Sequence, residues 1–187
     1  MVKKGQLYEG KAKKVFATDD PQLLIVDYKD DATAFNGLKK GTISGKGVIN
    51  NRMSNLLMQK LEKAGIPTHF VEELSERETL VKKVDIVPLE VIIRNIAAGS
   101  FSKRYGVEEG VVFDEPTIEF SYKNDELGDP LINDYHALAL KLATKEEIET
   151  IKKYAFGVND YLKAFWAECG VTLVDFKLEF GKIADGS

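Results

Sequence analysis

Three charged residues alternate along a strongly patterned segment near the carboxyl end, between Val171 and Phe180. Read as a β-strand, this segment places Asp175, Lys177 and Glu179 on one face and the intervening apolar side chains on the other. Carboxylate oxygens suit Mg²⁺, and a neighbouring lysine suits a phosphate group. The alternative interpretation is a solvated sheet face with internal ion pairs, and the pattern alone leaves both open.

A second candidate lies between Tyr8 and Val15, where the sequence reads Tyr-Glu-Gly-Lys-Ala-Lys-Lys-Val. The small residues Gly10 and Ala12 would let the backbone approach a ligand closely. Lys13 and its neighbours would add positive charge for a phosphate group. The spacing is not that of a P-loop, and an ordinary basic hairpin tip is the alternative.

A third candidate runs from Pro88 to Ser100. Within a strand at 89–94, Glu90 and Arg94 share a face. Gly-Ser at the end of the segment would begin a helix at 100–105, and the free N–H groups at a helix start attract an anion. The guanidinium fork of Arg94 could bind the same anion through two nitrogens. The segment therefore predicts a phosphomonoester site. An ion pair between Glu90 and Arg94 beside an ordinary helix start is the alternative.

Two polar stretches carry weaker signals. One is the loop from Lys123 to Asp129, and the other is the stretch at 30–37. Loops of this composition are most simply surface connections.

These candidates must be positioned by a mixed set of short elements. The first long helix is expected at 46–64, with Ser44 as its N-cap, after a glycine-rich loop at 37–47. A second long helix begins at a capping box that starts with Thr144 and ends at Gly170. Strands are expected at 6–9, 14–18, 23–28, 69–72, 78–84, 89–94, 111–113, 117–122 and 171–180.

The order of these elements predicts the fold class. Strands and helices do not alternate strictly, so an α+β fold of antiparallel sheets with packed helices is favoured over a doubly wound parallel sheet. We expect two lobes, at 1–84 and 85–187. The first long helix should bury an apolar stripe, which consists of Met53, Leu56, Leu57, Met58, Leu61 and Ala64.

Composition excludes several classes of protein. The chain has 187 residues, a formal charge of −4 and a pI near 5.4, which argues against a general nucleic-acid binder. Its single cysteine, Cys169, excludes an internal disulfide framework and a multi-cysteine zinc site. No apolar run approaches the roughly 20 residues that span a bilayer, and the start of the chain lacks a secretory signal. A cytoplasmic location is therefore expected.

Taken together, several segments resemble one family closely. They include Tyr8-Glu-Gly-Lys-Ala-Lys13, Leu80-Val-Lys-Lys83, Pro88-Leu-Glu-Val-Ile-Ile-Arg94, Ala97-Ala-Gly-Ser100 and Val174-Asp-Phe-Lys-Leu-Glu-Phe-Gly181. In this order they are similar to the signature stretches of phosphoribosylaminoimidazole-succinocarboxamide synthase (SAICAR synthetase) of the bacterial single-function type. The resemblance runs from about residue 6 to residue 181.

The resemblance implies an enzyme of de novo purine synthesis with a two-lobed fold, similar to protein kinases and ATP-grasp enzymes. Such enzymes join carboxyaminoimidazole ribonucleotide (CAIR) to L-aspartate with ATP and Mg²⁺, through an acyl phosphate of CAIR. The expected partners are these small molecules, with no nucleic acid and no membrane, while self-association of the chain stays open.

The resemblance also implies roles for individual residues. A loop of Gly10, Lys11, Ala12 and Lys13 would lie over the ATP phosphates, and Val15 and Leu24 would sandwich the adenine. The inter-lobe hinge, with Lys82, Val84 and Ile86, would read the adenine edge. Lys177 would touch the nucleotide phosphates. The substrate would be held by Glu90, Arg94, Ser100, Lys123, Asp129 and Asp175. Lys177 and Glu179 would be catalytic, and Glu179 would bind Mg²⁺.

The end of the chain carries a further expectation. Asp185-Gly186 is a hairpin-turn dipeptide with no returning strand, so part of the C-terminal lobe is expected to be missing. Members of the family continue with an acidic metal ligand, a Ser-Pro-Asp stretch and an arginine that helps to hold CAIR. A chain of this length is expected to be weakly active or inactive.

Two other functions remain open at this point. A kinase-like phosphotransferase would share the nucleotide site but would not need aspartate. The sequence contains neither a His-Arg-Asp nor an Asp-Phe-Gly motif, and this argues against a kinase-like enzyme. A nucleotide-binding module without turnover is the other alternative.

Overall fold

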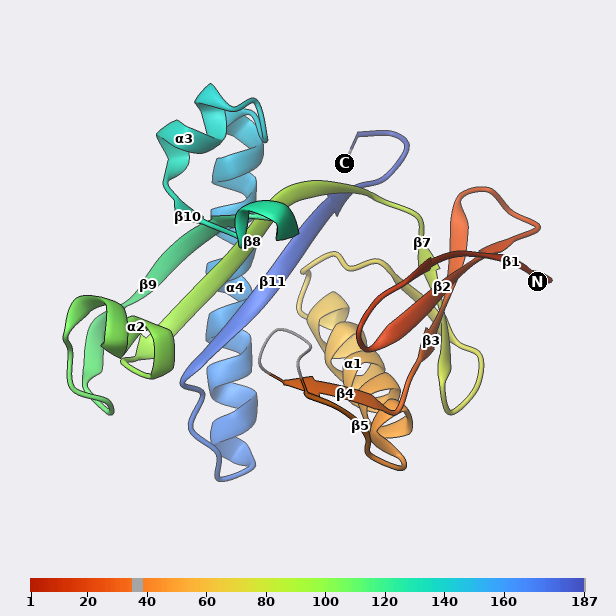
Figure 1. The fold of residues 1–187 in the computed structure, drawn as a ribbon, viewed down its shortest axis with the longest axis horizontal. Coiled ribbons are helices and arrows are strands. Elements are labelled where there is room, and N and C mark those ends of the chain that lie inside the picture. Colours follow the sequence, from red (N-terminus) through yellow and green to blue (C-terminus); the bar gives the residue numbers. More distant parts are fainter. Residues whose placement is uncertain (35–38, 187) are drawn as a thin grey trace. The chain divides into compact units, whose positions relative to one another are not determined.

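The structure is a computed structural model that describes residues 1–34 and 39–186, and it is mixed α and β (Figure 1). The expected α+β class with antiparallel sheets is confirmed. The chain forms two compact units, Met1–Asp85 with the chain end from Ile183, and Ile86–Lys182. We call them the first and the second unit. Their interpretation as two lobes of one active site stays a prediction.

The first unit is built on a five-stranded sheet in the order β1-β2-β3-β7-β6, and every neighbouring pair is antiparallel. A hairpin of two further strands, β4 and β5, precedes helix α1. The bounds are β1 Lys3–Glu9, β2 Lys13–Thr18, β3 Leu23–Tyr28, β4 Asp31–Ala34, β5 Lys39–Thr42, α1 Lys46–Lys63, β6 Phe70–Glu73 and β7 Glu78–Lys82. The loop predicted at 37–47 was wrong for Lys39–Thr42, while residues 35–38 lie outside the described part.

Helix α1 differs from its prediction at its start. Its N-cap is Gly45, which has a φ of 82°, rather than Ser44, and no side chain of its own segment caps it. The carboxylate of Asp30 takes this role, because Oδ1 accepts the backbone N–H of Gly47 (2.8 Å) and Oδ2 that of Gly45 (3.3 Å). A cap from a distant loop leaves no local sequence signal.

The buried face of α1 is also more polar than predicted. Met53 and Leu56 are exposed, whereas Asn51 and Asn55 are fully buried. Thr79 Oγ1 on β7 lies 2.6 Å from Asn51 Oδ1 and 2.9 Å from Asn55 Oδ1. Hydrogen bonds to the sheet thus position this helix where an apolar stripe was expected.

The second unit contains a four-stranded sheet in the order β10-β9-β8-β11. The two strands predicted at 111–113 and 117–122 form one continuous strand, β9, which pairs antiparallel with β8. The bounds are β8 Asp85–Ile96, α2 Gly99–Tyr105, β9 Val112–Tyr122, a 3₁₀ turn Asp125–Leu127, β10 Leu131–Ile132, α3 Asp134–Ala139, α4 Lys145–Glu168 and β11 Asp175–Lys182.

Helix α4 runs across one face of this sheet and builds the core of the second unit (Figure 1). Its capping box is confirmed, since the hydroxyl of Thr144 accepts the N–H of Glu147 and the Glu147 carboxylate accepts the N–H of Thr144. The core contains Leu89, Val91, Ile93, Phe120, Ile148, Ile151 and Ala155, with Phe176, Leu178 and Phe180 packed against it. The predicted alternation along β11 is therefore correct.

Strand β11 begins later than predicted, at Asp175 instead of Val171. The backbone N–H of Val171 is bonded to the carbonyl of Trp166 (2.8 Å), which completes the end of α4 after Gly170. An N–H used in this way cannot join a sheet ladder.

A reciprocal pair of amides is buried inside this core. Asn95 Nδ2 on β8 donates to Asn159 Oδ1 on α4 (2.8 Å), and Asn159 Nδ2 donates to Asn95 Oδ1 (3.1 Å). Both side chains are buried, and together they fix where α4 docks on the sheet.

Candidate active site

The sheet face opposite α4 is polar, and we call it the polar face. Strand β11 places three charged side chains on it, and each forms an ion pair within the second unit. Asp175 Oδ2 accepts from Arg94 (2.9 Å), Lys177 Nζ donates to Glu90 (2.6 Å), and Glu179 accepts from Lys123 (3.1 Å). The structure thus brings together six of the residues predicted for catalysis and substrate binding. Their pairing also matches the alternative interpretation of a sheet face with internal ion pairs, so function must be argued from further observations.

Arg94 is the most deeply buried charge of the polar face, with 6% of its side chain exposed. Besides Asp175, it donates through Nη2 to Ser100 Oγ (3.1 Å) and to Glu119 Oε2 (3.2 Å). Its guanidinium also lies 5.8 Å from the ring centre of Phe101. A charge-assisted network of this kind fixes the orientation of the guanidinium fork.

The predicted helix start beside Arg94 exists, but its first N–H is already used. The backbone N–H of Gly99, at the beginning of α2, donates to Glu109 Oε1 (2.9 Å). The predicted site at this helix start therefore rests on the side chains of Arg94 and Ser100.

Lys123 and Asp129 flank a tight turn that follows β9. The Asp129 carboxylate accepts the backbone N–H of Asn124 (2.8 Å), and Asp129 has a positive φ of 49°. A non-glycine residue in this region is strained, and such strain is concentrated at functional sites. The hydrogen bond to Glu179 raises the pKa of Lys123 above its ordinary value.

The acidic residues can be tested for a metal site. Among residues 1–34 and 39–186, no group of three or more His, Cys, Asp or Glu side chains is arranged to hold a metal ion. Mg²⁺ at nucleotide sites takes only one or two protein carboxylates and completes its shell with phosphate oxygens and water. The half-exposed carboxylate of Glu179 fits this mode of binding, and a fully protein-bound metal does not.

In the first unit, the predicted phosphate loop is the tip of the β1–β2 hairpin. Gly10, Lys11 and Ala12 form the turn, which is closed by a hydrogen bond from Gly10 N–H to the Lys13 carbonyl (2.9 Å). Lys11 and Lys13 are exposed. Two exposed lysines with long, flexible side chains are suited to bind phosphate groups.

Lys29, which sequence analysis missed, holds this turn in place. Its backbone N–H donates to the Ala12 carbonyl (2.8 Å), and its Nζ contacts Glu9 and Asp31, each at 2.6 Å. Hydrogen bonds to Asp31 and Glu9 raise the pKa of Lys29.

The predicted adenine-binding residues share one sheet face with Lys13. Val15 and Ala17 are on that face with Lys13 because side chains alternate along β2, and Leu24 pairs with Ala17. The face continues to Thr79 on β7, where α1 packs.

The predicted hinge residues lie at the end of the first unit and the start of the second. Lys82 ends β7 and donates to the Thr68 carbonyl (3.1 Å), Val84 is half-buried, and Ile86 on β8 is exposed. Their role in reading a nucleotide stays a prediction.

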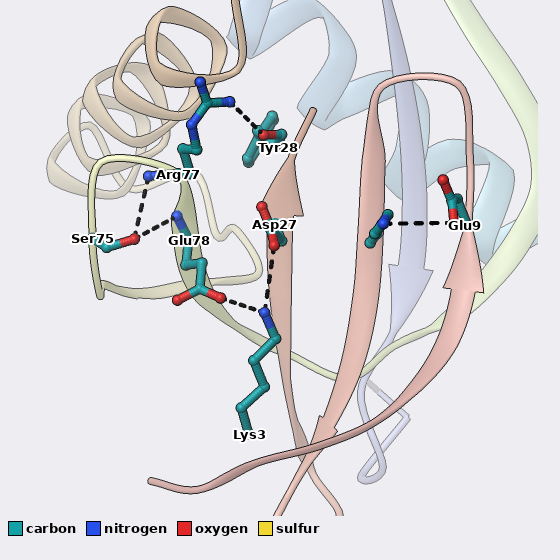
Figure 2. A network of polar contacts seen from close by, with 8 residues as sticks. Lys3, Glu9, Asp27, Tyr28, Ser75, Arg77 and Glu78 are labelled. Atoms are coloured by element: carbon teal, nitrogen blue, oxygen red, sulfur yellow. Dashed lines mark hydrogen bonds and ion pairs between the residues drawn. The ribbon is translucent and has the colours of Figure 1, made fainter. Parts of the chain in front are cut away.

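A separate polar network in the first unit organises its strands and turns (Figure 2). Lys3 reaches Asp27 and Glu78, and Arg77 donates to the carbonyl of Tyr28 (3.3 Å). Ser75 Oγ accepts the backbone N–H groups of Arg77, which precedes β7, and of Glu78, which begins it. None of the predicted site residues is among the residues that Figure 2 labels.

The same Arg77 forms a two-point contact with Asp30, with both nitrogen–oxygen distances at 2.8 Å. This contact, together with the N–H of Gly47, holds the pKa of Asp30 well below its usual range. A Cβ atom at position 47 would lie 2.4 Å from the Tyr28 carbonyl oxygen, so the position requires glycine. The stretch at 30–37 thus includes a helix-capping carboxylate.

Glu119 on β9 is the second residue that sequence analysis missed. It faces the polar side of the sheet between Thr117 and Ser121, and only 10% of its side chain is exposed. The same strand also carries Asp114 and Glu115, so no signal in the sequence set Glu119 apart.

Comparison with known proteins adds independent information. A sequence model of the family described as SAICAR synthetase matches residues 6–187. The phosphoribosylaminoimidazole-succinocarboxamide synthase of Lachnoclostridium phytofermentans is 64% identical over 185 residues, which cover 99% of this chain and 79% of that protein. The enzyme of Caldanaerobacter subterraneus is 62% identical over 186 residues, which cover 100% of this chain and 79% of that protein.

Solved structures agree with the sequence comparison. The Ehrlichia chaffeensis phosphoribosylaminoimidazole-succinocarboxamide synthase superposes with a TM-score of 0.94 at 49% identity, covering 97% of this chain and 76% of that one. A SAICAR synthetase in complex with ADP has a TM-score of 0.93 at 48% identity, covering 96% and 76%. The resemblance first noted in the motifs therefore extends over nearly the whole chain, which belongs to the SAICAR synthetase family.

Proposed function

We propose that the protein carries out the ATP-dependent ligation of L-aspartate to CAIR, which gives SAICAR, ADP and phosphate in purine biosynthesis. The observation that carries the proposal is family membership over residues 6–187, at up to 64% identity to enzymes named for this reaction. The related structure with ADP supports ATP as the nucleotide substrate.

The polar face of the second unit is proposed to bind CAIR. Arg94 and Ser100, which already contact each other, would hold the ribose phosphate, because a guanidinium fork and a hydroxyl suit phosphate oxygens. Glu90 would face the imidazole. Asp175, Lys123 and Asp129 border the same face and would complete the substrate site.

The first unit is proposed to bind the nucleotide. The hairpin tip, Gly10 to Lys13, would cover the phosphate groups. Val15 and Leu24 would enclose adenine, and the backbone from Lys82 to Ile86, through Val84, would read the edge of the base. Lys177, half-exposed on β11, would bind a phosphate group once it releases Glu90.

The chemistry requires two bond changes that both involve anions. A carboxylate oxygen of CAIR attacks the terminal phosphorus of ATP, and ADP leaves with the electrons of the broken P–O bond. The amine of aspartate then attacks the activated carbonyl carbon, phosphate departs, and the amine loses a proton. Lys177 and Arg94 would lower the repulsion among these anions, so catalysis would rest on positioning and charge neutralisation.

Magnesium would supply additional charge neutralisation at the phosphate groups when it is bound, with Glu179 as its protein ligand. Lys123 already shares the Glu179 carboxylate and would have to release it.

Among the described residues, no helix is long and apolar enough to cross a membrane. We place the reaction in the cytoplasm as part of the proposal.

The direct test is an ADP-release assay on the protein at its full natural length, with CAIR, ATP, Mg²⁺ and L-aspartate. We expect ADP release to require both CAIR and aspartate, with SAICAR formed in equal amount. ADP release that proceeds equally well without aspartate would support a phosphotransferase instead. Binding of ATP without turnover would support a nucleotide-binding module.

A further inference from the structure

Two carboxylates contact Arg94, and their surroundings differ. Glu119 has 10% of its side chain exposed, and Asp175 has 38%. Glu119 contacts the Nη2 end of the guanidinium, which Ser100 also contacts, while Asp175 contacts the Nη1 end. The two ends of Arg94 are therefore held by different partners: a buried carboxylate and the exposed Ser100 at one end, and a more exposed carboxylate at the other.

Hydrogen bonding around Arg94 is incomplete. Among residues 1–34 and 39–186, five buried side-chain polar atoms have no hydrogen-bond partner in the protein. One is on Asn55 of the first unit, and the other four are Arg94 Nε, Thr117 Oγ1, Glu119 Oε1 and Ser102 Oγ. Thr117 lies directly opposite Arg94 in the β8–β9 ladder. A buried polar group without a partner costs about 1–3 kcal/mol, so this concentration marks a site built for something other than stability.

The cost of separation differs between the two contacts. Removing one partner of a buried ion pair leaves an uncompensated charge and is strongly unfavourable. A carboxylate that is more than a third exposed recovers its hydration when it is released, and such exposed pairs contribute little. An incoming phosphate can therefore replace Asp175 at the Nη1 end, whereas Glu119 remains at the Nη2 end.

We propose that Glu119 is the positioning residue of the substrate site: it holds the Arg94 guanidinium in the orientation that binds the phosphate of CAIR. Asp175 gives up its contact with the Nη1 end to the phosphate and remains one of the residues proposed to bind the substrate. This inference rests on the proposed function, in which Arg94 binds that phosphate. Glu119 itself touches no substrate. Its second partner, Arg104 at 3.6 Å, lies farther out and has 37% of its side chain exposed.

The test is steady-state kinetics of Glu119→Gln in the protein at its full natural length. Glutamine keeps the size and an acceptor oxygen but removes the charge, so Arg94 should turn toward Asp175. We expect KM for CAIR to rise about tenfold, with kcat and KM for ATP changed less than about threefold. A purely structural role would instead lower the melting temperature and leave the KM for CAIR unchanged.

One further variant gives a matched comparison. Arg104→Gln removes the outer partner of the same carboxylate, and we expect its KM for CAIR to stay within about twofold of wild type. An increase for Arg104→Gln that equals or exceeds the increase for Glu119→Gln would overturn the proposal.

The outcomes separate this inference from the proposed function. If Arg94→Ala leaves the KM for CAIR unchanged, the phosphate-binding role of Arg94 in the proposed function fails. If Arg94→Ala raises that KM and Glu119→Gln does not, the positioning role alone fails. If Glu119→Gln does not fold, Glu119→Asp keeps the charge with a shorter reach. We then expect a rise of about threefold, and an unchanged KM contradicts the proposal.

Discussion

Arg77 in the first unit and Arg94 in the second unit are each bound by carboxylates, and the two arrangements differ in completeness. Arg77 meets Asp30 through two parallel contacts of 2.8 Å, and both Asp30 oxygens accept further backbone N–H groups. Arg94 divides its donors among Ser100, Glu119 and Asp175, and its Nε has no partner although it is buried.

This difference is the one that we expect between a structural ion pair and an ion pair at a substrate site. Asp30 and Arg77 bind each other through both carboxylate oxygens and both terminal nitrogens, and Asp30 also caps α1. The buried and incompletely bonded Arg94 has donors that a substrate can use. Completeness of hydrogen bonding is thus a more informative criterion than ion pairing alone, because both arginines form ion pairs.

The largest effect is expected from Arg94→Ala. Loss of a charged contact to a phosphate costs about 2–5 kcal/mol, so KM for CAIR should rise on the order of a hundredfold, with KM for ATP little changed. Initial rates at varied CAIR measure the effect, with Arg77→Ala as the matched arginine. Equal increases in KM for CAIR in the two variants would abolish the distinction between the two sites.

A smaller kinetic effect is expected from Lys177→Ala. Loss of a lysine that neutralises the nucleotide should lower kcat/KM for ATP by about thirtyfold. Lys182→Ala is the matched control, because Lys182 is also a half-exposed lysine of β11 in an ion pair, with Glu147 at 2.7 Å. We expect less than a twofold change for the control. A similar loss in both variants would indicate a general charge effect of the strand.

Asp30→Asn should affect stability and spare the substrate site. The variant loses the ionic contact to Arg77 and weakens the cap of α1, so its melting temperature should fall by several degrees at neutral pH. Differential scanning fluorimetry measures the shift, and KM for CAIR serves as the internal control. A changed KM for CAIR with an unchanged melting temperature would reverse the comparison.

The pH dependence of that stability difference follows from the pKa of Asp30. Arg77 and the helix N–H groups hold this pKa below its unfolded value, which is about 3.9. The stabilising contribution is therefore fully present above pH values near 4 and is lost as the pH falls through the folded-state pKa. We expect the difference in free energy of unfolding between wild type and Asp30→Asn to be largest near neutral pH and to shrink in acid. Urea unfolding at several pH values measures this difference. A gap that grows in acid would contradict this assignment.

Local patterns in the sequence were sufficient for some features and insufficient for others. Alternation along β11 correctly separated Asp175, Lys177 and Glu179 from the core side chains, and the capping box at Thr144 was correct. Both depend on neighbours within a few residues. The motif resemblance gave the family, because its segments preserve their order along the chain.

Features that depend on distant contacts were not predicted. Asp30 replaces Ser44 as the cap of α1 through a partner, Arg77, that is 47 positions away. Glu119 meets Arg94 only because β8 and β9 pair in one register. Neither contact has a local pattern, and neither residue differs in type from ordinary surface acids. The substrate roles given to the polar-face residues stay predictions.

The Asn95–Asn159 amide pair restricts where α4 can dock along the sheet of the second unit. If α4 moved along its axis by one turn, Ala155 or Lys163 would stand where Asn159 is. The amide of Asn95 would then face a methyl group or an alkyl chain and would lose both hydrogen bonds. Two neutral side chains thus add a directional requirement to the docked position of a long helix, beyond the contacts of its apolar residues.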